Sequence, residues 1–311
     1  MKIDVIIPNY NGSNLIKKNL SDVIKSFGDF KKVSIIVVDD GSQPEDVVKL
    51  RNTIDLVNMS SKVPVTLIPR EKNGGFSSAV NTGVANSKAD LVLLLNSDAV
   101  PYEGFLPPIL KRFENDPMLF GVGCMDISIE GKEKVERGRG VAYWKKGILR
   151  HRKGDVDNDD TFWISGGSSM VRRELYKKFN GMDEIYNPFY WEDIDLSYRV
   201  QKAGYKIVFE KQSKVEHRHD EGAIKKHFRS DRVNAIVYRN QFIFHWKNIT
   251  DGSLIISHFF WMPFHLLNAI IHLDKPFIKG FFNALNIMSQ ILARRKLQKK
   301  YYIKTDKELI R

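Results

Sequence analysis

The chain has 311 residues, which is enough to bury a sizeable hydrophobic core in one large domain or two smaller ones. Hydrophobic residues make up 42% of the sequence and charged residues 28%, a balance that excludes a disordered or fibrous protein. The single cysteine, Cys124, excludes an intramolecular disulfide and fits a reducing compartment. Because no apolar stretch of about 7–15 residues follows Met1, we expect no cleaved secretory signal.

The formal net charge is +12, and much of it lies at the C-terminal end. Residues 294–311 contain eight Lys and Arg against two acids, which gives +6, half of the total. This skew indicates a basic tail rather than a basic binding face on the main domain. An anionic membrane surface or a polyanion would suit such a tail.

The N-terminal part of the sequence alternates between predicted strands and predicted helices. Apolar runs that end at turn residues predict strands over residues 4–8, 34–38, 63–69 and 91–95. Helices are expected to begin near Ser13, where apolar residues repeat every three or four positions, and near Pro44 and Ser77. This alternation predicts an open α/β sheet that is mostly parallel.

Polar side chains follow three of these strands at the point where each strand ends. They are Tyr10 after the first strand, Asp39 and Asp40 after the second, and Asn96 and Asp98 after the fourth. The carboxyl edge of an open parallel sheet is where ligands bind. Any one of these residues could instead be an ordinary turn former, but three such sets at one edge favour a ligand site.

The nature of that ligand is limited by the motifs that the sequence lacks. No G-x-G-x-x-G follows the first strand, and no G-x-x-x-x-G-K-[ST] occurs anywhere in the chain. A phosphorylated ligand would therefore need its charge neutralised in another way, most simply by a divalent cation on carboxylates. Asp98 is suited to that role, since it is a hard oxygen donor at a strand end.

A second acid-rich segment begins at Tyr190 and runs to His217 in the C-terminal half. Three acids, Glu192, Asp193 and Asp195, precede a predicted helix that stops at Gly204, and a short strand is expected over 206–210. Taken alone, acids at a helix start are caps or partners of the helix dipole. Beside the polar strand ends of the first half, they could also face a bound ligand.

Several motifs in fixed order resemble the family 2 glycosyltransferases with the GT-A fold, and in particular the rhamnosyltransferase-like branch. They are PNYNG at 8–12, VVDDGS at 37–42, NGGFSSAVNTG at 73–83, LLLNSD at 93–98, ISGGSSMVRREL at 164–175, the segment 179–205 and VEH at 215–217. The resemblance covers roughly residues 3–245. It implies a Rossmann-like α/β fold, with a mostly parallel central sheet flanked by helices.

The resemblance also implies a division of the chain. Residues 1–222 would form the GT-A catalytic domain, with a nucleotide-binding half of about 1–100 and an acceptor half of about 101–222. Residues 223–311 would form a helical C-terminal extension that carries an amphipathic segment and the basic tail.

Residues that hold the donor and a metal are implied by the same likeness. The donor nucleotide would contact Pro8, Tyr10, Asp40, Gly75, Asn96 and Asp98, with Asp40 accepting from the N–H of a pyrimidine ring. The D-x-D metal motif of the family appears here as Asn96-Ser97-Asp98, so Asp98 alone supplies a carboxylate. His217 matches the downstream histidine that reaches the same ion, Mn²⁺ or Mg²⁺.

Asp193 matches the general base of the family, which removes the proton of the acceptor hydroxyl during a single inverting displacement. Glu192 is the rival for this role, and we expect it to orient the acceptor or the helix start. Trp191 offers a flat face for a sugar ring, with core packing as the alternative. Gly167 would let the backbone approach the donor or would simply form a tight turn. No Q-x-x-R-W segment of the processive synthases is present, which favours transfer of one sugar or very few.

The run 252–273 has 22 residues without Asp, Glu, Lys or Arg, which is long enough to span a bilayer. Its histidines, His258, His265 and His272, are seven apart and share one helical face, so the run is amphipathic. We expect a helix that lies on an anionic membrane, which places the protein on the cytoplasmic face of the cell membrane. The alternatives are packing on the catalytic domain, a homodimer through these helices, or a membrane span.

The expected function is an inverting, metal-dependent glycosyltransferase of cell-surface polysaccharide assembly. It would move one sugar, with rhamnose favoured, from a dTDP- or UDP-sugar to a hydroxyl of a glycan or lipid-linked acceptor. A sugar nucleotidyltransferase is one alternative, although PNYNGS lacks the basic residue usual in its first loop. A non-catalytic polyanion binder is another, but acids at the ligand edge argue against it and against a nucleic-acid partner.

Overall fold

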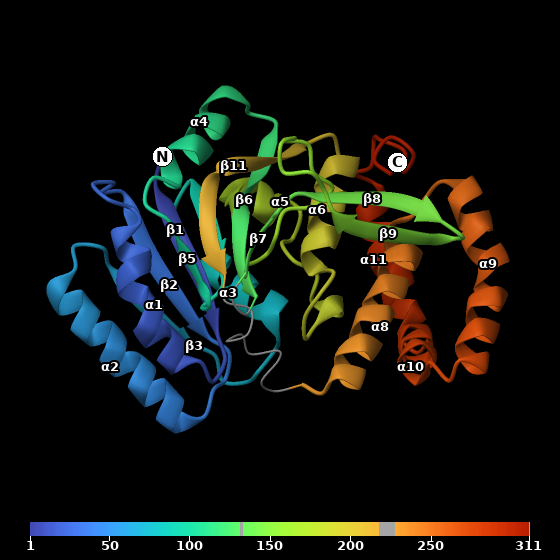
Figure 1. Ribbon diagram of the computed structural model, residues 1–311, viewed down its shortest axis with the longest axis horizontal. Helices are drawn as coiled ribbons and strands as arrows, with labels where there is room; N and C mark the ends of the chain where they lie inside the picture. Colours follow the sequence, from blue (N-terminus) through green and yellow to red (C-terminus); the bar gives the residue numbers. More distant parts are fainter. Residues whose placement is uncertain (131–132, 218–227, 311) are drawn as a thin grey trace.

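The computed structural model describes residues 1–130, 133–217 and 228–310 (Figure 1). It contains a mixed sheet of nine strands in the order β3-β2-β1-β4-β10-β6-β11-β5, with β7 paired to β6. The strands β1 to β4 are mutually parallel, whereas β10 runs antiparallel to both β4 and β6. The predicted α/β fold with a mostly parallel sheet is confirmed.

The first half of the chain supplies one end of the sheet and the helices that cover it. Its elements are β1 (Ile3–Asn9), α1 (Ser13–Lys25), β2 (Val33–Asp39), α2 (Pro44–Ser60), β3 (Val65–Pro69), α3 (Phe76–Asn86), β4 (Leu91–Leu95), β5 (Ala99–Pro101), α4 (Leu106–Asn115) and β6 (Leu119–Glu130). The predicted strands and helices of this half therefore lie where the sequence pattern places them.

The middle of the chain completes the sheet and adds a separate β-hairpin. Its elements are β7 (Glu133–Arg137), β8 (Gly140–Lys145), β9 (Ile148–Lys153), β10 (Ser168–Arg172), α5 (Arg173–Lys178), the 3₁₀ turn η1 (Glu184–Tyr186), α6 (Glu192–Lys202) and β11 (Lys206–His217). The strand predicted over 206–210 is too short, because β11 continues to His217 by pairing with β6 and then β5. The β8–β9 hairpin was not anticipated.

Helices cover both faces of the sheet because side chains alternate along each strand. In β1, Val5 and Ile7 pack with α1, α2 and α4, whereas Ile6 packs with α3, α5 and α6. Two separate apolar layers thus hold the sheet between them. This sandwich leaves the strand ends, and the loops that follow them, free to form a site.

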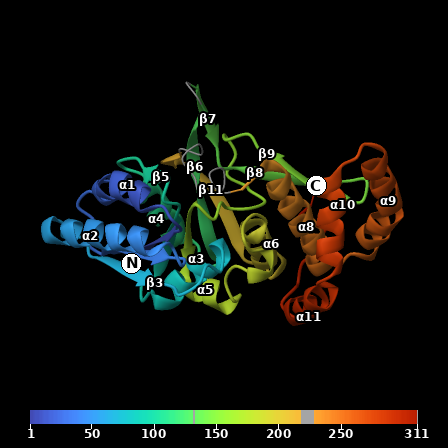
Figure 2. The ribbon, with the colours of Figure 1, turned by 90° about the horizontal axis from the view of Figure 1, so that it is seen from below.

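Four helices close the described chain: α8 (Ser230–Asn248), α9 (Gly252–Ile271), α10 (Lys275–Leu285) and α11 (Met288–Lys299). They stand beside the sheet, at the end far from α1 and α2 (Figure 2). Their apolar side chains share one core with Leu149 of β9, with Trp191 in the turn before α6 and with Tyr198 of α6. The predicted boundary at 222–223 lies outside the described residues.

The described part of the basic segment 294–311 is fixed to the rest of the protein, which the sequence did not indicate. Residues after α11 fold back onto α6, and Asp306 is fully buried. Lys202 donates to Asp306 (2.5 Å), and the backbone N–H groups of Thr250 and Asp251 donate to the same carboxylate (2.6 Å each). A buried carboxylate needs such partners, and the partners fix the tail in place.

Two buried histidines join α8 and α9 to the β8–β9 hairpin. His245 donates from Nδ1 to a backbone carbonyl of α8 and accepts the Leu149 N–H at Nε2 (2.8 Å). His258 donates from Nδ1 to the Gly147 carbonyl (2.7 Å) and accepts the Trp246 indole N–H at Nε2 (3.0 Å). Each ring thus uses one nitrogen as donor and one as acceptor, which requires the neutral form.

We expect the thermal midpoint to fall as the pH drops from about 7.5 to about 5.5. Burial lowers the pKa of both His245 and His258, whereas an unfolded histidine keeps a value near 6.5. The neutral rings therefore contribute full stability above about pH 6.5, and that stability is lost as the pH falls toward the lowered folded-state pKa values. Scanning fluorimetry should show that the thermal midpoint of His258→Gln depends less on pH than that of wild type. The exposed His272→Gln should keep the pH dependence of wild type. Equal pH dependence in all three proteins would contradict this account.

Candidate active site

The loop after β2 carries two aspartates with different surroundings. Asp39 is fully buried and accepts the Asn9 side-chain N–H (2.8 Å) and the Ser42 hydroxyl (2.6 Å), so it shapes the turn. Asp40 accepts from the Arg70 guanidinium and from the N–H groups of Gly74 (3.1 Å) and Gly75 (2.8 Å).

Burial raises the pKa of Asp40, while these backbone hydrogen bonds and Arg70 oppose that change. A carboxylate has about four lone-pair positions, so three contacts leave room for roughly one further donor. Pro8 and Tyr10, both half-buried, lie at the end of the neighbouring β1, since Pro8 pairs with Val38 of β2. The structure therefore brings Pro8, Tyr10 and Asp40 to one edge of the sheet.

Gly75 lies immediately before α3, in contact with the loop that leads to α6. Its φ of +87° belongs to the left-handed region, which favours glycine. A Cβ at this position would lie 2.9 Å from the side chain of Asn187. Asn187 in turn donates to the Gly74 carbonyl and to the Ser78 hydroxyl (2.9 Å). The glycine-rich loop and the acid-rich segment are thus joined directly.

A strip of backbone connects Asn96 with Asp193. The Asn96 N–H donates to the Gly167 carbonyl (2.9 Å), and a Cβ on Gly167 would lie 2.4 Å from Asn96 Nδ2. One residue earlier in the strip, the N–H of Gly166 donates to Asp193 Oδ2 (3.2 Å). The glycine pair therefore allows the end of β4 to approach the start of α6, and both predicted halves of the site meet here.

His217 lies between two carboxylates because of the strand pairing around it. It pairs with Ala99 of β5 and with Ser128 of β6, which places its ring between Asp98 and Asp126. Nε2 lies 3.1 Å from Asp98 Oδ1, and Nδ1 lies 2.8 Å from Asp126 Oδ2. All three side chains are buried. The predicted pair of Asp98 and His217 is therefore in direct contact, whereas Asp126 was not predicted.

Burial opposes a charged ring at His217, but the hydrogen bonds to Asp126 and Asp98 and the charges of both carboxylates raise its pKa to about 9. A carboxylate oxygen and an imidazole nitrogen at this separation fit one divalent cation, which would replace the proton on Nε2. Among the described residues, no group of three or more His, Cys, Asp or Glu side chains is placed to hold an ion. An ion here would need further oxygens from a ligand or from water.

Glu192 and Asp193 form a close pair of carboxyl groups at the start of α6. Glu192 is only 6% exposed, and its Oε2 has no hydrogen-bond partner among the described residues. Burial, followed by the charge of Asp193, raises the pKa of Glu192 well above its usual range. Burial also raises the pKa of Asp193, against the N–H groups of Gly166 and Ile194. Glu192 therefore holds a proton more readily than Asp193 does.

Trp191 does not offer an open face to a ligand. It is 3% exposed, and its ring packs against His151 (5.2 Å between centroids) and Phe244 (5.3 Å). Core packing, the alternative reading, therefore accounts for this side chain, because burial removes it from contact with a sugar. The neighbouring Tyr190 is 42% exposed and remains accessible beside the acids.

The backbone just before the acids is held by α8, which sequence reasoning missed. Tyr190 and Trp191 both have left-handed φ angles, of 69° and 76°, which is rare in successive non-glycine residues. Asn240 donates to the carbonyls of Tyr186 (2.7 Å), Phe189 (2.9 Å) and Tyr190 (2.8 Å). These contacts stabilise the strained turn that orients the start of α6.

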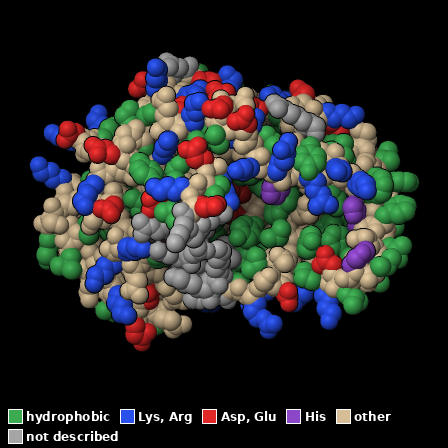
Figure 3. Space-filling model, in the orientation of Figure 1, with side chains coloured by type: hydrophobic (Ala, Val, Ile, Leu, Met, Phe, Trp, Pro, Cys, Tyr) green, Lys and Arg blue, Asp and Glu red, His purple; other side chains and the backbone are tan. Residues whose placement is uncertain are grey.

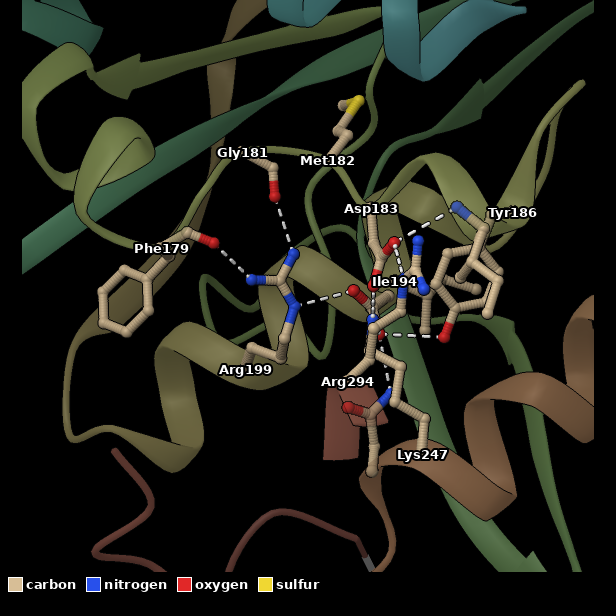
Figure 4. Close-up of polar contacts among 12 residues, drawn as sticks. Phe179, Gly181, Met182, Asp183, Tyr186, Ile194, Arg199, Lys247 and Arg294 are labelled. Atoms are coloured by element: carbon tan, nitrogen blue, oxygen red, sulfur yellow. Dashed lines mark hydrogen bonds and ion pairs between the residues drawn. The ribbon is translucent and has the colours of Figure 1, made fainter. Parts of the chain in front are cut away.

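A buried network of charges also ties α6 to α8 and α11 (Figure 4). Lys247 Nζ lies 2.9 Å from Asp195 Oδ1 and 2.6 Å from Asp183 Oδ2. Arg199 donates to Asp195 (2.7 Å), and Arg294 of α11 donates to Asp183 (2.9 Å). Burial would raise the pKa of both Asp183 and Asp195, but the nearby cations, above all Lys247, lower the pKa of both aspartates. Asp195 thus has a structural role two residues after Asp193.

Two proteins of known name are similar in sequence to most of this chain. The pre-mycofactocin glycosyltransferase of Mycobacterium tuberculosis is 28% identical over 220 residues, which cover 70% of this chain and 43% of that protein. The O-antigen chain rhamnosyltransferase RfbN of Salmonella typhimurium is 27% identical over 227 residues, covering 71% of this chain and 67% of that protein. The chain thus spans less than half the length of the first relative.

Solved structures share the fold at low sequence identity. GalNAc-T7 with UDP, GalNAc and Mn²⁺ has a TM-score of 0.63 and 18% identity, covering 79% of this chain and 48% of that one. S. aureus TarS 1–349 with UDP-GlcNAc has a TM-score of 0.61 and 15% identity, covering 97% and 91%.

A family model described as glycosyl transferase family 2 matches residues 4–179, which is more than half of the chain. The matched region contains β1 to β4 and the loops that carry Asp40, Gly75 and Asp98. With the GT-A fold and the sequence relatives in agreement, the chain belongs to glycosyl transferase family 2.

Proposed function

We propose that this protein moves one sugar from a nucleotide diphosphate donor to an acceptor hydroxyl with inversion, and that Asp193 is the general base. The observation that carries the proposal is the backbone strip through Gly166 and Gly167, which joins Asn96 to Asp193. A donor bound along the strand ends would have its sugar beside this strip. A carboxylate there can accept the proton of the attacking hydroxyl.

The pair of carboxyl groups supports this assignment of roles. Asp193 accepts two backbone N–H groups, which favour its charged form, whereas burial and the charge of Asp193 raise the pKa of Glu192 and so favour its neutral form. A charged carboxylate serves as base, and a neutral carboxyl can donate a hydrogen bond to the acceptor. Glu192 would thereby orient the acceptor, as the sequence led us to expect.

The donor nucleotide would lie at the ends of β1, β2 and β4. Its base would sit by Pro8 and Tyr10, with the remaining lone pair of Asp40 accepting a ring N–H. Gly75 and Asn96 would contact the rest of the donor through backbone and amide groups. Mn²⁺ or Mg²⁺, held by Asp98 and His217, would neutralise the charge on the departing diphosphate.

Asp126→Asn is expected to weaken Mn²⁺ binding about 10–100-fold, the usual effect of losing the carboxylate that orients a metal-bound histidine. Asp126 accepts from Nδ1 and so directs Nε2 toward Asp98. The Mn²⁺ dependence of nucleoside diphosphate binding, followed by calorimetry, measures the change. Asp157→Asn is the matched control, because Asp157 is exposed and pairs only with surface Lys211 among the described residues. Equal Mn²⁺ affinities in the two variants would refute the role of Asp126.

The likeness to a protein named as a rhamnosyltransferase supports rhamnose as the sugar. The UDP and UDP-GlcNAc named for two solved structures of the same fold are in keeping with a dTDP- or UDP-sugar as the donor. The acceptor would be a glycan or lipid-linked hydroxyl of cell-surface polysaccharide assembly. We place the enzyme on the cytoplasmic face of the membrane as a peripheral protein. The alternative is that the C-terminal helices form a homodimer interface instead of contacting the membrane.

A donor panel tests the proposal. Each nucleotide sugar is incubated with the full chain, Mn²⁺ and a mixture of glycan and lipid-linked acceptors, and nucleoside diphosphate release is scored. Release from one sugar nucleotide, abolished by chelator, is the expected result. Full activity in excess chelator would refute the proposed dependence on a metal ion. Formation of a new diphosphate bond would indicate a nucleotidyltransferase instead.

A further inference from the structure

One face of α9 is both apolar and exposed. Seven side chains along it are between 54% and 71% exposed, namely Ile256, Phe259, Phe260, Phe264, Leu267, Ile270 and Ile271. Their spacing of three and four places them on one side of the helix. Hydrophobic side chains gather along the same edge of the molecule in Figure 3. A contiguous apolar surface of this kind marks an interaction site.

The opposite face of α9 is fixed to the protein. His258 donates to the Gly147 carbonyl (2.7 Å), His265 Nε2 lies 2.8 Å from the Lys146 carbonyl, and Ser257 accepts the Trp144 indole N–H (3.2 Å). His258 and His265 therefore mark the protein side of the helix, not a water-facing side. Although α9 is long and apolar enough to cross a membrane, these contacts hold it flat against the β8–β9 hairpin.

Exposed lysines lie in the two elements next to α9. Lys145 ends β8 and Lys146 follows it in the hairpin turn, with Lys146 Nζ 5.5 Å from the ring centroid of Trp261 in α9. Lys275 and Lys279 lie in α10, which follows α9. Helix α9 itself contains no acid, and the acids at its two ends, Asp251 and Asp274, are half-buried next to helix starts. The surroundings of the apolar face are therefore cationic, in a chain whose net charge is +12.

Charge decides between the two occupants of such a face. A two-fold homodimer through α9 would bring the lysines of both copies into one interface, and α9 offers no acid to pair with them. An anionic leaflet would attract them instead, while its acyl region takes up the aromatic and aliphatic side chains. A helix of 20 residues is about 30 Å long, which presents several anchors to the surface at once.

We propose that the outward face of α9 docks in the interfacial layer of a bilayer containing anionic lipid, with the helix axis in the membrane plane. This docking proposal rests on the proposed peripheral location and specifies which face of the protein contacts the membrane. It does not depend on the transfer chemistry. The active site would then be held at the membrane surface, where a lipid-linked acceptor resides.

The test is cosedimentation of the full chain with vesicles of phosphatidylcholine alone or with phosphatidylglycerol added. Wild type is expected to bind the anionic vesicles, and more weakly at high salt. The triple variant Phe259→Ser/Phe260→Ser/Phe264→Ser should bind roughly a hundredfold more weakly, because three apolar anchors are lost. Lys275→Glu/Lys279→Glu should weaken binding to anionic vesicles only.

Leu56→Ser/Met59→Ser on α2 is the matched control, since both side chains are exposed and apolar but α2 lies at the opposite end of the molecule from α9 (Figure 2). It should bind vesicles like wild type. No binding by wild type, an equal loss in the control, or a dimer that the triple variant dissolves would each overturn the proposal. So would retention in membranes after alkaline carbonate washing, which indicates a spanning helix. Nucleoside diphosphate binding, measured in parallel, should be unchanged in every variant, so failure of docking is distinguishable from failure of the proposed function.

Discussion

Asp193→Asn is expected to slow sugar transfer by about 10²–10⁴-fold, the range that a general base contributes. The amide keeps the size of the side chain and can still lie near the Gly166 N–H, but it cannot take a proton from the acceptor hydroxyl. Donor affinity should be nearly unchanged, because the proposed donor contacts lie at the ends of β1, β2 and β4. Calorimetric titration with a nucleoside diphosphate, combined with steady-state rates, separates the two effects.

Glu192→Gln is the informative companion of this variant. If Glu192 is neutral in the active protein, an amide replaces a protonated carboxyl with a group that still donates a hydrogen bond. The transfer rate should then fall far less than in Asp193→Asn. Near-normal turnover by Asp193→Asn, together with an inactive Glu192→Gln, would assign the base to Glu192 instead.

Lys247→Met should destabilise the protein by about 3 kcal/mol, because breaking a buried ion pair leaves its anions without compensation. Lys247 is fully buried and contacts both Asp183 and Asp195, and Arg199 and Arg294 can replace it only in part. Urea unfolding followed by fluorescence gives the free energy of unfolding. The variant should also lose activity below its unfolding midpoint, since Asp195 lies on the same helical turn as Asp193.

Lys211→Met is the matched control for that experiment. Lys211 forms an ion pair with Asp157 at 3.0 Å, but both side chains are exposed to solvent. Exposed pairs contribute less than about 1 kcal/mol, so this variant should unfold almost like wild type. Equal losses in the two lysine variants would show that the buried network is not a special source of stability.

Local patterns were sufficient to predict the N-terminal half of the fold. Residues 91–95 are five consecutive apolar residues bounded by polar ones, and β4 covers this same range. The carboxyl ends of parallel strands must meet at one edge, so the proximity of Tyr10, Asp40 and Asp98 followed from the order of the elements. The contact between Asp98 and His217 followed from the family resemblance rather than from any local signal.

Features that depend on distant contacts could not be predicted. Asp126 is an acid within an apolar strand, and only the pairing of β6 with β11 brings it to His217. Asn240 lies 50 residues from Tyr190, and nothing in either segment marks the contact. The spacing of His258 and His265 correctly placed them on one face, but which face meets the protein depends on the hairpin that α9 packs against.

The central claim is that the strand-end cluster binds a nucleoside diphosphate through a divalent cation. Calorimetric titration of the full chain with UDP, dTDP and GDP, in Mn²⁺ and in chelator, tests it without knowledge of the acceptor. We predict saturable binding of at least one of them in Mn²⁺, lost in chelator and in Asp98→Ala. Absence of binding by all three nucleotides in Mn²⁺, or binding by Asp98→Ala equal to that of wild type, would contradict the account.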